Sequence, residues 1–257
     1  MTRVIAVANQ KGGVGKTTTA VNLAAALHTA RQRVLLVDLD PQGNATTGSG
    51  VDKRAASPSV YDVLVDGADA AAASVTAPGG GYVLVPANAD LTAAKSALLA
   101  LPRREFRLRE TLAPVRAQYD YIVLDCPPAL DMLTVNALVA AGSVLIPMQC
   151  EFYALEGLAD LMDTIAGVAG NANPGLHVEG VVRTLYDPRN RLAHDVSAEL
   201  KRHFDDRLLR TLIPRNVRLA EAPSHGQSIL SYDPRCPGAR AFLTLAGELL
   251  RRHAVPQ

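Results

Sequence analysis

Residues 4–18 read VIAVANQKGGVGKTT, and this stretch decides the fold. The five apolar residues from Val4 to Ala8 have the length and composition of a buried strand. A glycine-rich loop follows directly, and residues 16–30, KTTTAVNLAAALHTA, then have high helix propensity. A strand, a glycine loop and a helix in this order are typical of the first unit of a phosphate-binding α/β fold.

The rest of the chain repeats this alternation of strands and helices. Short runs rich in β-branched residues cover 4–8, 34–37, 82–85, 121–124, 143–147 and 177–182, with longer helical patterns between them. This order predicts a mostly parallel, twisted sheet with helices on both faces. We therefore expect a single α/β P-loop NTPase domain spanning residues 1–257. Residues 67–81, rich in Ala, Gly and Pro, read as a surface connection, and the apolar spacing from Phe242 to His253 predicts a helix closing over the core.

Composition argues against several classes of protein. Hydrophobic residues make up 48% of the chain and charged residues 20%, which is ordinary for a folded protein and unlike a disordered one. The three cysteines, Cys126, Cys150 and Cys236, are odd in number and far apart, so neither a disulfide framework nor a CxxC metal site is indicated. The apolar run before Asn9 is too short for a signal peptide or a membrane span. We expect reduced thiols in a cytoplasmic protein.

The charge of the chain is unevenly distributed. The formal net charge is +1, but residues 183–218 hold nine Arg or Lys against five Asp or Glu, so the remainder carries −3. A local excess of this kind indicates a basic surface patch.

Each part of the loop 10-QKGGVGKTT-18 favours the binding of an anion. Its glycines let backbone N–H groups converge on phosphate oxygens, Lys16 neutralises phosphate charge, Thr17 offers a hydroxyl to magnesium, and the helix N-terminus faces the anion. The loop departs from the common GxxxxGK[ST] pattern, because Gln10 replaces the first glycine and Lys11 adds a second cation. The residues expected to bind the nucleotide are Lys11, Gly12, Gly13, Val14, Gly15, Lys16, Thr17 and Thr18.

Acidic residues follow two apolar strands. The segment 34-VLLVDLDPQGN-44 carries Asp38 and Asp40, and 121-YIVLDCPP-128 carries Asp125 in the manner of a Walker B element. Ligands of open α/β sheets bind at the carboxyl ends of strands, where these side chains would lie. We expect Asp125, together with Thr17, to serve Mg²⁺, and Asp38 and Asp40 to lie at the same edge of the sheet.

These motifs together resemble the deviant-Walker ATPases of the ParA/MinD type, whose signature is KGGxGKT. The segments 147-PMQCEFYALEGL-158 and 212-LIPRNVRLAEAPSHGQSILSYDPR-235 make the chain similar to the chromosomal ParA/Soj group from Ile5 to about Ala241. The resemblance implies that Lys11 reaches across a dimer interface to the partner's nucleotide and that Asp40 acts on the attacking water, so Lys11, Lys16 and Asp40 form the catalytic set. It also implies that Asp38 belongs to the magnesium shell, that Pro214 and Asn216 lie beside the adenine, and that Glu151 faces the nucleotide or the dimer partner.

The resemblance implies a switch that acts in chromosome or plasmid segregation. ATP with Mg²⁺ would form a sandwich homodimer, the dimer would bind double-stranded DNA without sequence preference, and a ParB-like partner would stimulate slow hydrolysis. Such a protein would be cytoplasmic and associated with the nucleoid, and we expect no helix-turn-helix extension before the loop. The DNA-binding candidates in the basic region are Arg189, Arg191, Lys201, Arg202 and Arg218.

Two other functions share the same ATPase core. A MinD-like protein would dock on membranes through an amphipathic C-terminal helix, but the tail 248-ELLRRHAVPQ-257 is weakly apolar and broken by Pro256, so we expect no membrane partner. A metabolic enzyme of the superfamily, such as a reductase component with an iron–sulfur cluster between subunits or a dethiobiotin-type ligase, is the other alternative. Cys126 and Cys150 would be the candidate cluster ligands, but the residues that flank them in sequence match the motifs of the ParA/Soj group instead.

Overall fold

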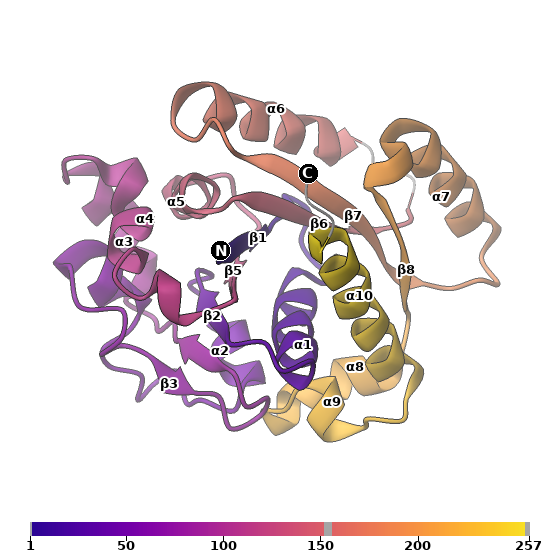
Figure 1. Cartoon of the computed structure of the whole chain (residues 1–257), viewed down its shortest axis with the longest axis horizontal. Helices are drawn as coiled ribbons and strands as arrows, with labels where there is room; N and C mark the ends of the chain where they lie inside the picture. Colours follow the sequence, from indigo (N-terminus) through magenta and orange to yellow (C-terminus); the bar gives the residue numbers. More distant parts are fainter. Residues whose placement is uncertain (1, 152–155, 255–257) are drawn as a thin grey trace.

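The computed structural model describes residues 2–151 and 156–254. One eight-stranded sheet runs through the molecule in the order β3-β4-β2-β5-β1-β6-β7-β8 (Figure 1). Every strand pair is parallel except β3 with β4. The expected mostly parallel sheet is confirmed. The strands are β1 Arg3–Val7, β2 Val34–Asp38, β3 Val75–Thr76, β4 Val83–Val85, β5 Tyr121–Asp125, β6 Ser143–Gln149, β7 His177–Tyr186 and β8 Leu208–Pro214.

Helices cover both faces of the sheet, and successive strand residues point to opposite faces. In β1, Val4 and Ala6 pack into one core and Ile5 and Val7 into the other. The first core is closed by α3 Leu91–Leu99, α4 Arg107–Leu112, α5 Met132–Ala140, α6 Glu156–Asn171 and α7 Arg191–Phe204. The second is closed by α1 Lys16–Thr29, α2 Asn44–Gly48, α8 Val217–Glu221, α9 Ile229–Tyr232 and α10 Pro237–Ala254. Short 3-10 or π turns lie at Asp62–Asp66, Arg104–Phe106, Arg116–Gln118, Asp205–Arg207 and Ala222–His225.

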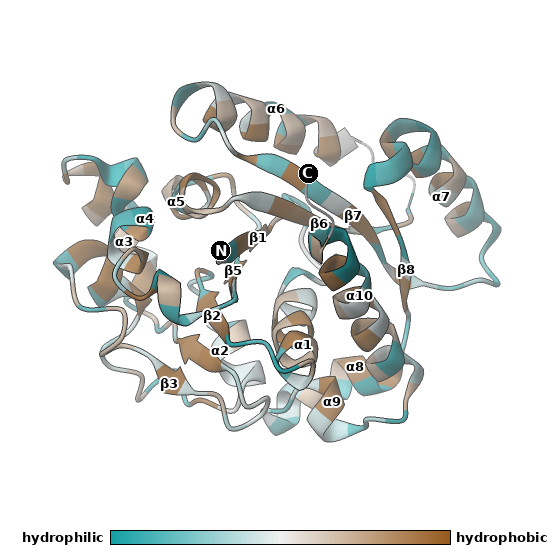
Figure 2. Ribbon diagram, viewed as in Figure 1, coloured by the Kyte–Doolittle hydropathy of each residue, from teal (hydrophilic) through white to brown (hydrophobic). Residues whose placement is uncertain are grey.

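The strands contain the hydrophobic sequence that this two-sided burial requires. Figure 2 shows predominantly hydrophobic residues along the central strands, whereas hydrophilic residues gather on the helix surfaces and connections. The predicted C-terminal helix is confirmed as α10, and its residues Phe242, Leu245 and Leu249 are fully buried. In the part of the chain that the structure describes, none of the helices is long and apolar enough to cross a membrane.

Two strands escaped the sequence reading. β8 is an edge strand that mixes apolar residues with Arg210 and Thr211, and its register with β7 is interrupted, so the pattern of a buried strand is weak. β3 has only two residues, and it lies within the Ala-, Gly- and Pro-rich connection 67–81. Both depend on pairing with a neighbouring strand.

The strand order places the switch point of the sheet between β1 and β5. The chain leaves β1 through α1 to β2 and leaves β5 through α5 to β6, on opposite faces of the sheet. The two connections therefore diverge between β1 and β5, which is where open α/β sheets bind their ligands. Val7 of β1 and Asp38 of β2 are both register partners of Asp125 in β5, so the ends of these three strands lie side by side.

Candidate functional site

The glycine loop between β1 and α1 forms a compact turn over this edge. Gly13 and Gly15 have φ values of 76° and 86°, in the left-handed region that glycine adopts at little cost. Asn9 anchors the start of the loop, because its side-chain amide donates to the Pro147 carbonyl at 2.8 Å and its side-chain oxygen accepts from the Lys11 N–H at 3.0 Å. The loop is therefore fastened to β6 before it reaches the helix.

The two loop lysines occupy different environments. Lys16 is buried, and its ammonium donates to the Lys11 carbonyl at 3.0 Å, back across the loop. Burial lowers the pKa of Lys16, and the charge of Asp125 opposes that shift. Lys11 instead extends to a partly exposed ion pair with Glu151, with 2.9 Å between Nζ and Oε2. The structure thus places Lys16 within its own loop and Lys11 at the surface.

Asp38 at the end of β2 is fully buried and engaged by the protein. Its Oδ2 accepts from both the N–H and the hydroxyl of Thr46 at 2.7 Å, and its Oδ1 accepts from the Asp40 N–H at 3.1 Å. Burial raises the pKa of Asp38 from 3.8 to about 6, against the effect of these hydrogen bonds. Asp40 is buried too, and its Oδ1 accepts from the Gln42 N–H at 2.9 Å. Asp38 therefore holds the segment that carries Asp40.

Asp125 contrasts with Asp38, its neighbour across the sheet. Both Asp125 carboxylate oxygens are buried, and neither has a hydrogen-bond partner within residues 2–151 and 156–254. Burial, followed by the negative charge of Asp38, raises the pKa of Asp125 well above its ordinary value, and the nearby Thr17 hydroxyl and the Lys16 ammonium oppose this shift. A buried carboxylate without donors is costly unless a cation compensates it.

These residues fit a magnesium ion that is only partly held by the protein. Carboxylates are the ligands that Mg²⁺ prefers, and this ion usually keeps several waters beside one or two carboxylates and substrate phosphates. Within the described ranges, no cluster of three His, Cys, Asp or Glu side chains forms a complete metal site. Asp125 and Thr17 would supply the protein's ligands to this ion. Asp38 is the weaker candidate of the three predicted residues, because both of its carboxylate oxygens already accept hydrogen bonds.

The predicted adenine residues lie at the same edge of the sheet, beyond β7. Pro214 ends β8 and is the register partner of Tyr186, and the Arg215 N–H donates to the Tyr186 carbonyl at 3.0 Å. Asn216 follows, and its side-chain oxygen is buried with no hydrogen-bond partner in the part of the chain described. Such an orphaned acceptor is consistent with a polar ligand at this turn.

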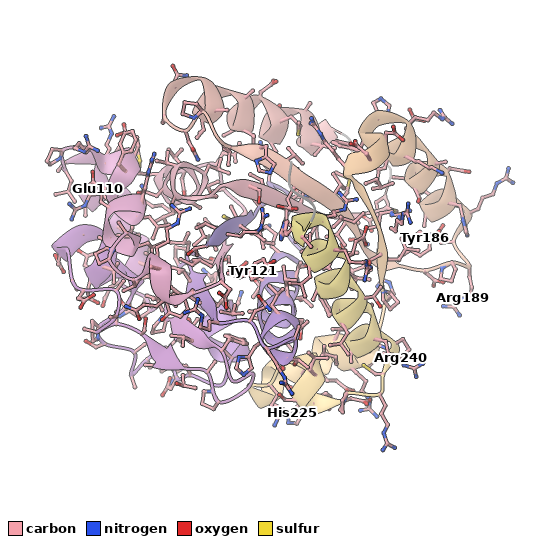
Figure 3. All side chains as sticks on the ribbon, viewed as in Figure 1. Glu110, Tyr121, Tyr186, Arg189, His225 and Arg240 are labelled. Carbon is pink, nitrogen blue, oxygen red and sulfur yellow. The ribbon has the colours of Figure 1, made fainter. Side chains whose placement is uncertain are left out.

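Arg189 lies in the turn between β7 and α7. Figure 3 shows it projecting away from the body of the molecule, and its side chain is 88% exposed. Within the turn it pairs with Asp187, with 2.8 Å between Nη2 and Oδ2. An exposed pair of this kind is weak and can exchange for another anion.

The other basic candidates are dispersed over two helices. Arg191 begins α7 and Arg202 lies near its end, about 16.5 Å apart at 1.5 Å per residue and on the same helical face. Lys201 lines a cavity of about 880 Å³ between β7, β8 and the end of α10. Arg218 on α8 pairs with Glu221 at 2.9 Å. The structure therefore places Arg189 and Arg191 two residues apart at the start of α7, whereas Lys201 and Arg202 lie near the other end of that helix and Arg218 lies on α8.

The structure adds site residues that sequence reasoning passed over. Thr184 on β7 donates its hydroxyl to the Val14 carbonyl of the loop, Asn9 fastens the loop to β6, and Thr46 holds Asp38. Threonine and asparagine are common in strands and loops alike, so their residue type alone gave no signal. Only their contacts distinguish them.

The cysteines do not form a surface site. Cys126 and Cys150 are 1% and 4% exposed and pack within the same core. Burial raises the pKa of the Cys150 thiol to about 11. Residues 152–155 of the family-like segment 147–158, and residues 255–257 of the tail considered for membranes, lie outside the described residues.

Comparisons with known proteins agree with this geometry. A family model described as an AAA domain matches residues 2–178. An uncharacterized protein of Pseudomonas putida is 59% identical over 256 residues, covering 100% of this chain and 97% of that protein. The sporulation initiation inhibitor protein Soj of Bacillus subtilis is 50% identical, with 97% and 98% covered, and the chromosome partitioning protein ParA of Caulobacter vibrioides is 49% identical, with 97% and 94% covered.

A solved structure shows the same architecture with a nucleotide. The cobyrinic acid a,c-diamide synthase of Mycobacterium smegmatis with bound ADP and magnesium superposes with a TM-score of 0.88. It is 39% identical in sequence, and the match covers 100% of this chain and 97% of that one.

Proposed function

Because the chain belongs to the ParA/Soj family of chromosome-partitioning ATPases, we propose that it is an ATP-dependent switch whose dimer holds DNA. One observation carries the nucleotide part of this proposal. The buried carboxylate of Asp125, which has no hydrogen-bond partner among the described residues, lies beside Lys16 and the glycine loop, where a magnesium nucleotide would satisfy it. The DNA part rests on the exposed turn after β7 and on the local excess of positive charge.

The loop would bind ATP by its phosphates. N–H groups of residues 12–18 would donate to phosphate oxygens, and Lys16 would neutralise charge between them. Thr17 and Asp125 would hold Mg²⁺, which when bound spreads the charge that develops on the phosphates. Asp40 would orient the attacking water, and the hydrogen bonds that fix Asp38 to the Asp40 N–H and to Thr46 would keep Asp40 in place.

Lys11 would act between two copies of the chain. It lies at the surface in an exposed pair with Glu151, and such a pair contributes little stability. The phosphates of a partner's ATP offer a more highly charged anion, so exchange of Glu151 for phosphate would favour association only when ATP is bound. ATP would therefore control the dimer.

The dimer would hold DNA through phosphate contacts. Arg189 and Arg191, two residues apart at the start of α7, would give each copy a small basic site, and a dimer would present two such sites together. Binding would be indifferent to sequence and steeply dependent on salt. A nucleoid location follows from this binding, and a ParB-like partner would accelerate a slow hydrolysis that returns the protein to monomers.

The MinD-like alternative is disfavoured by the packing of α10. A helix that docks on a membrane needs a free apolar face, but Phe242, Leu245 and Leu249 are buried in the core beside α1. The described end of this helix offers Arg251 and Arg252 instead.

The test is retention on long, non-specific double-stranded DNA with ATP or ADP. We expect retention with ATP only, and loss of it in Arg189→Glu while ATP-dependent dimerisation persists. Arg240→Glu is the matched control, because Arg240 is an exposed arginine on α10, a different element from the turn that carries Arg189 (Figure 3). Equal retention with ADP, or equal loss in both variants, would refute the proposed switch or its assigned surface.

A further inference from the structure

Thr184 connects the sheet to the phosphate loop from a distant part of the chain. It is 2% exposed on β7, and its hydroxyl donates to the carbonyl oxygen of Val14 at 2.7 Å, 170 positions away in the sequence. Val14 is itself 1% exposed. This is a buried, short hydrogen bond to the backbone of the loop.

The bond fixes the direction of one peptide group. Val14 C=O and Gly15 N–H belong to the same planar trans peptide, in which carbonyl and N–H point in opposite directions. Because Thr184 holds the carbonyl toward β7, the Gly15 N–H must point away from β7. In a phosphate loop, this N–H belongs to the set that faces the phosphates.

The orientation of this peptide needs a hydrogen bond to fix it, because Gly15 forms one side of the peptide. Gly15 has φ of 86°, and glycine adopts positive and negative φ with similar ease. A flip of the Val14–Gly15 peptide plane would turn the Gly15 N–H away from the phosphate-binding site. The β-carbon of Thr184 also lies close, because a side chain added at Gly15 would meet it at 3.9 Å.

We propose that Thr184 is a positioning residue for nucleotide binding: its hydroxyl orients the Val14–Gly15 peptide so that the Gly15 N–H faces phosphate. This rests on the proposed function only in that the loop binds a nucleotide. β7 ends two residues later at Tyr186, and Tyr186 accepts from the N–H of Arg215 beside the predicted adenine turn. One strand thus supports both ends of the nucleotide site.

The test compares variants that keep or lose the hydroxyl at constant shape. Thr184→Val should bind magnesium ADP and magnesium ATP about tenfold more weakly by calorimetry, as expected for one misaligned donor and a buried carbonyl left unpaired. Thr184→Ser keeps the hydroxyl and should stay within about twofold of the wild type. Thr184→Ala offers a second variant without the hydroxyl if the valine variant folds poorly.

Thr211→Val is the matched control for lost stability. Thr211 is also buried on a strand, and its hydroxyl donates to Glu248 at 2.6 Å, away from the loop. It should lower the unfolding temperature without weakening nucleotide affinity. Affinity in Thr184→Val and Thr184→Ala equal to that of the wild type, or an equal loss in Thr184→Ser, would overturn the proposal. A wild-type protein that binds no nucleotide would instead overturn the proposed function.

Discussion

Replacing Asp125 by Asn should stabilise the nucleotide-free protein while abolishing its ATP turnover. The carboxylate is buried, its two oxygens have no donors within the described residues, and Asp38 and Asp40 add negative charge near it. The nearby Thr17 hydroxyl and the Lys16 ammonium oppose the raised pKa of Asp125. An amide of the same shape removes one charge from this cluster and is a weaker, uncharged ligand for Mg²⁺.

The size of the effect follows from the cost of burying a charge. The pKa of the neighbouring Asp38, raised from 3.8 to about 6, corresponds to about 3 kcal/mol. The asparagine amide still leaves buried polar atoms without partners among the described residues, so loss of the charge alone should contribute about 1–3 kcal/mol. For a chain of 257 residues, 1 kcal/mol shifts the unfolding temperature by about 2 °C. We therefore expect Asp125→Asn to raise that temperature by about 2–6 °C at pH 7.5.

The matched control stands at the other end of the same strand. Asp120 precedes β5, and hydrogen bonds from Arg33 lower its pKa to about 2. Asp120→Asn removes a favourable exposed interaction, so it should lower stability slightly and leave turnover intact. The two Asp→Asn changes should thus have opposite signs in the same thermal unfolding assay.

The pH dependence gives an independent check. A carboxyl whose pKa is raised by folding stabilises the native state below its unfolded pKa, and this contribution is lost as pH rises through the folded pKa. The stabilisation that Asp38 contributes is lost between about pH 4 and pH 6. Asp125, whose pKa is also raised, likewise loses its contribution as pH rises. The stability advantage of Asp125→Asn should therefore shrink as pH falls from 7.5 to 5. An unchanged or lower unfolding temperature at pH 7.5, or wild-type turnover, would refute the reasoning.

Three further substitutions test the assigned roles. Lys16→Ala should abolish ATP binding in calorimetry, because phosphate loses its cation within the loop, and unchanged affinity would contradict the phosphate-loop assignment. Lys11→Ala should bind ATP but fail to dimerise in sedimentation, whereas a normal dimer would make Lys11 a solvated loop residue. Asp40→Ala should bind ATP and dimerise but lose at least about 100-fold in turnover in a phosphate-release assay, and a wild-type rate would assign the water to another carboxylate.

Local pattern was sufficient for much of the fold and for the phosphate loop. The strand, glycine loop and helix of residues 4–30 are formed by neighbours in sequence, so periodicity and composition predicted β1 and α1 to within a residue or two. The apolar runs that end in Asp38 and Asp125 likewise indicated strands with carboxylates at one edge. β8 could not be predicted in this way, because its pairing with β7 supplies what its mixed sequence lacks.

The sequence by itself determined which residues could carry the chemistry: two lysines, the glycines between them and three aspartates at strand ends. Only the tertiary structure decided which of these residues takes which role. Asp38 and Asp125 look alike in sequence, but Thr46 donates to Asp38, whereas Asp125 has no donor in the part of the chain that the structure describes. Thr184 braces Val14 across 170 positions. Contacts of this kind depend on which strands lie side by side, and that is set by burial of the whole sheet rather than by any segment of the chain.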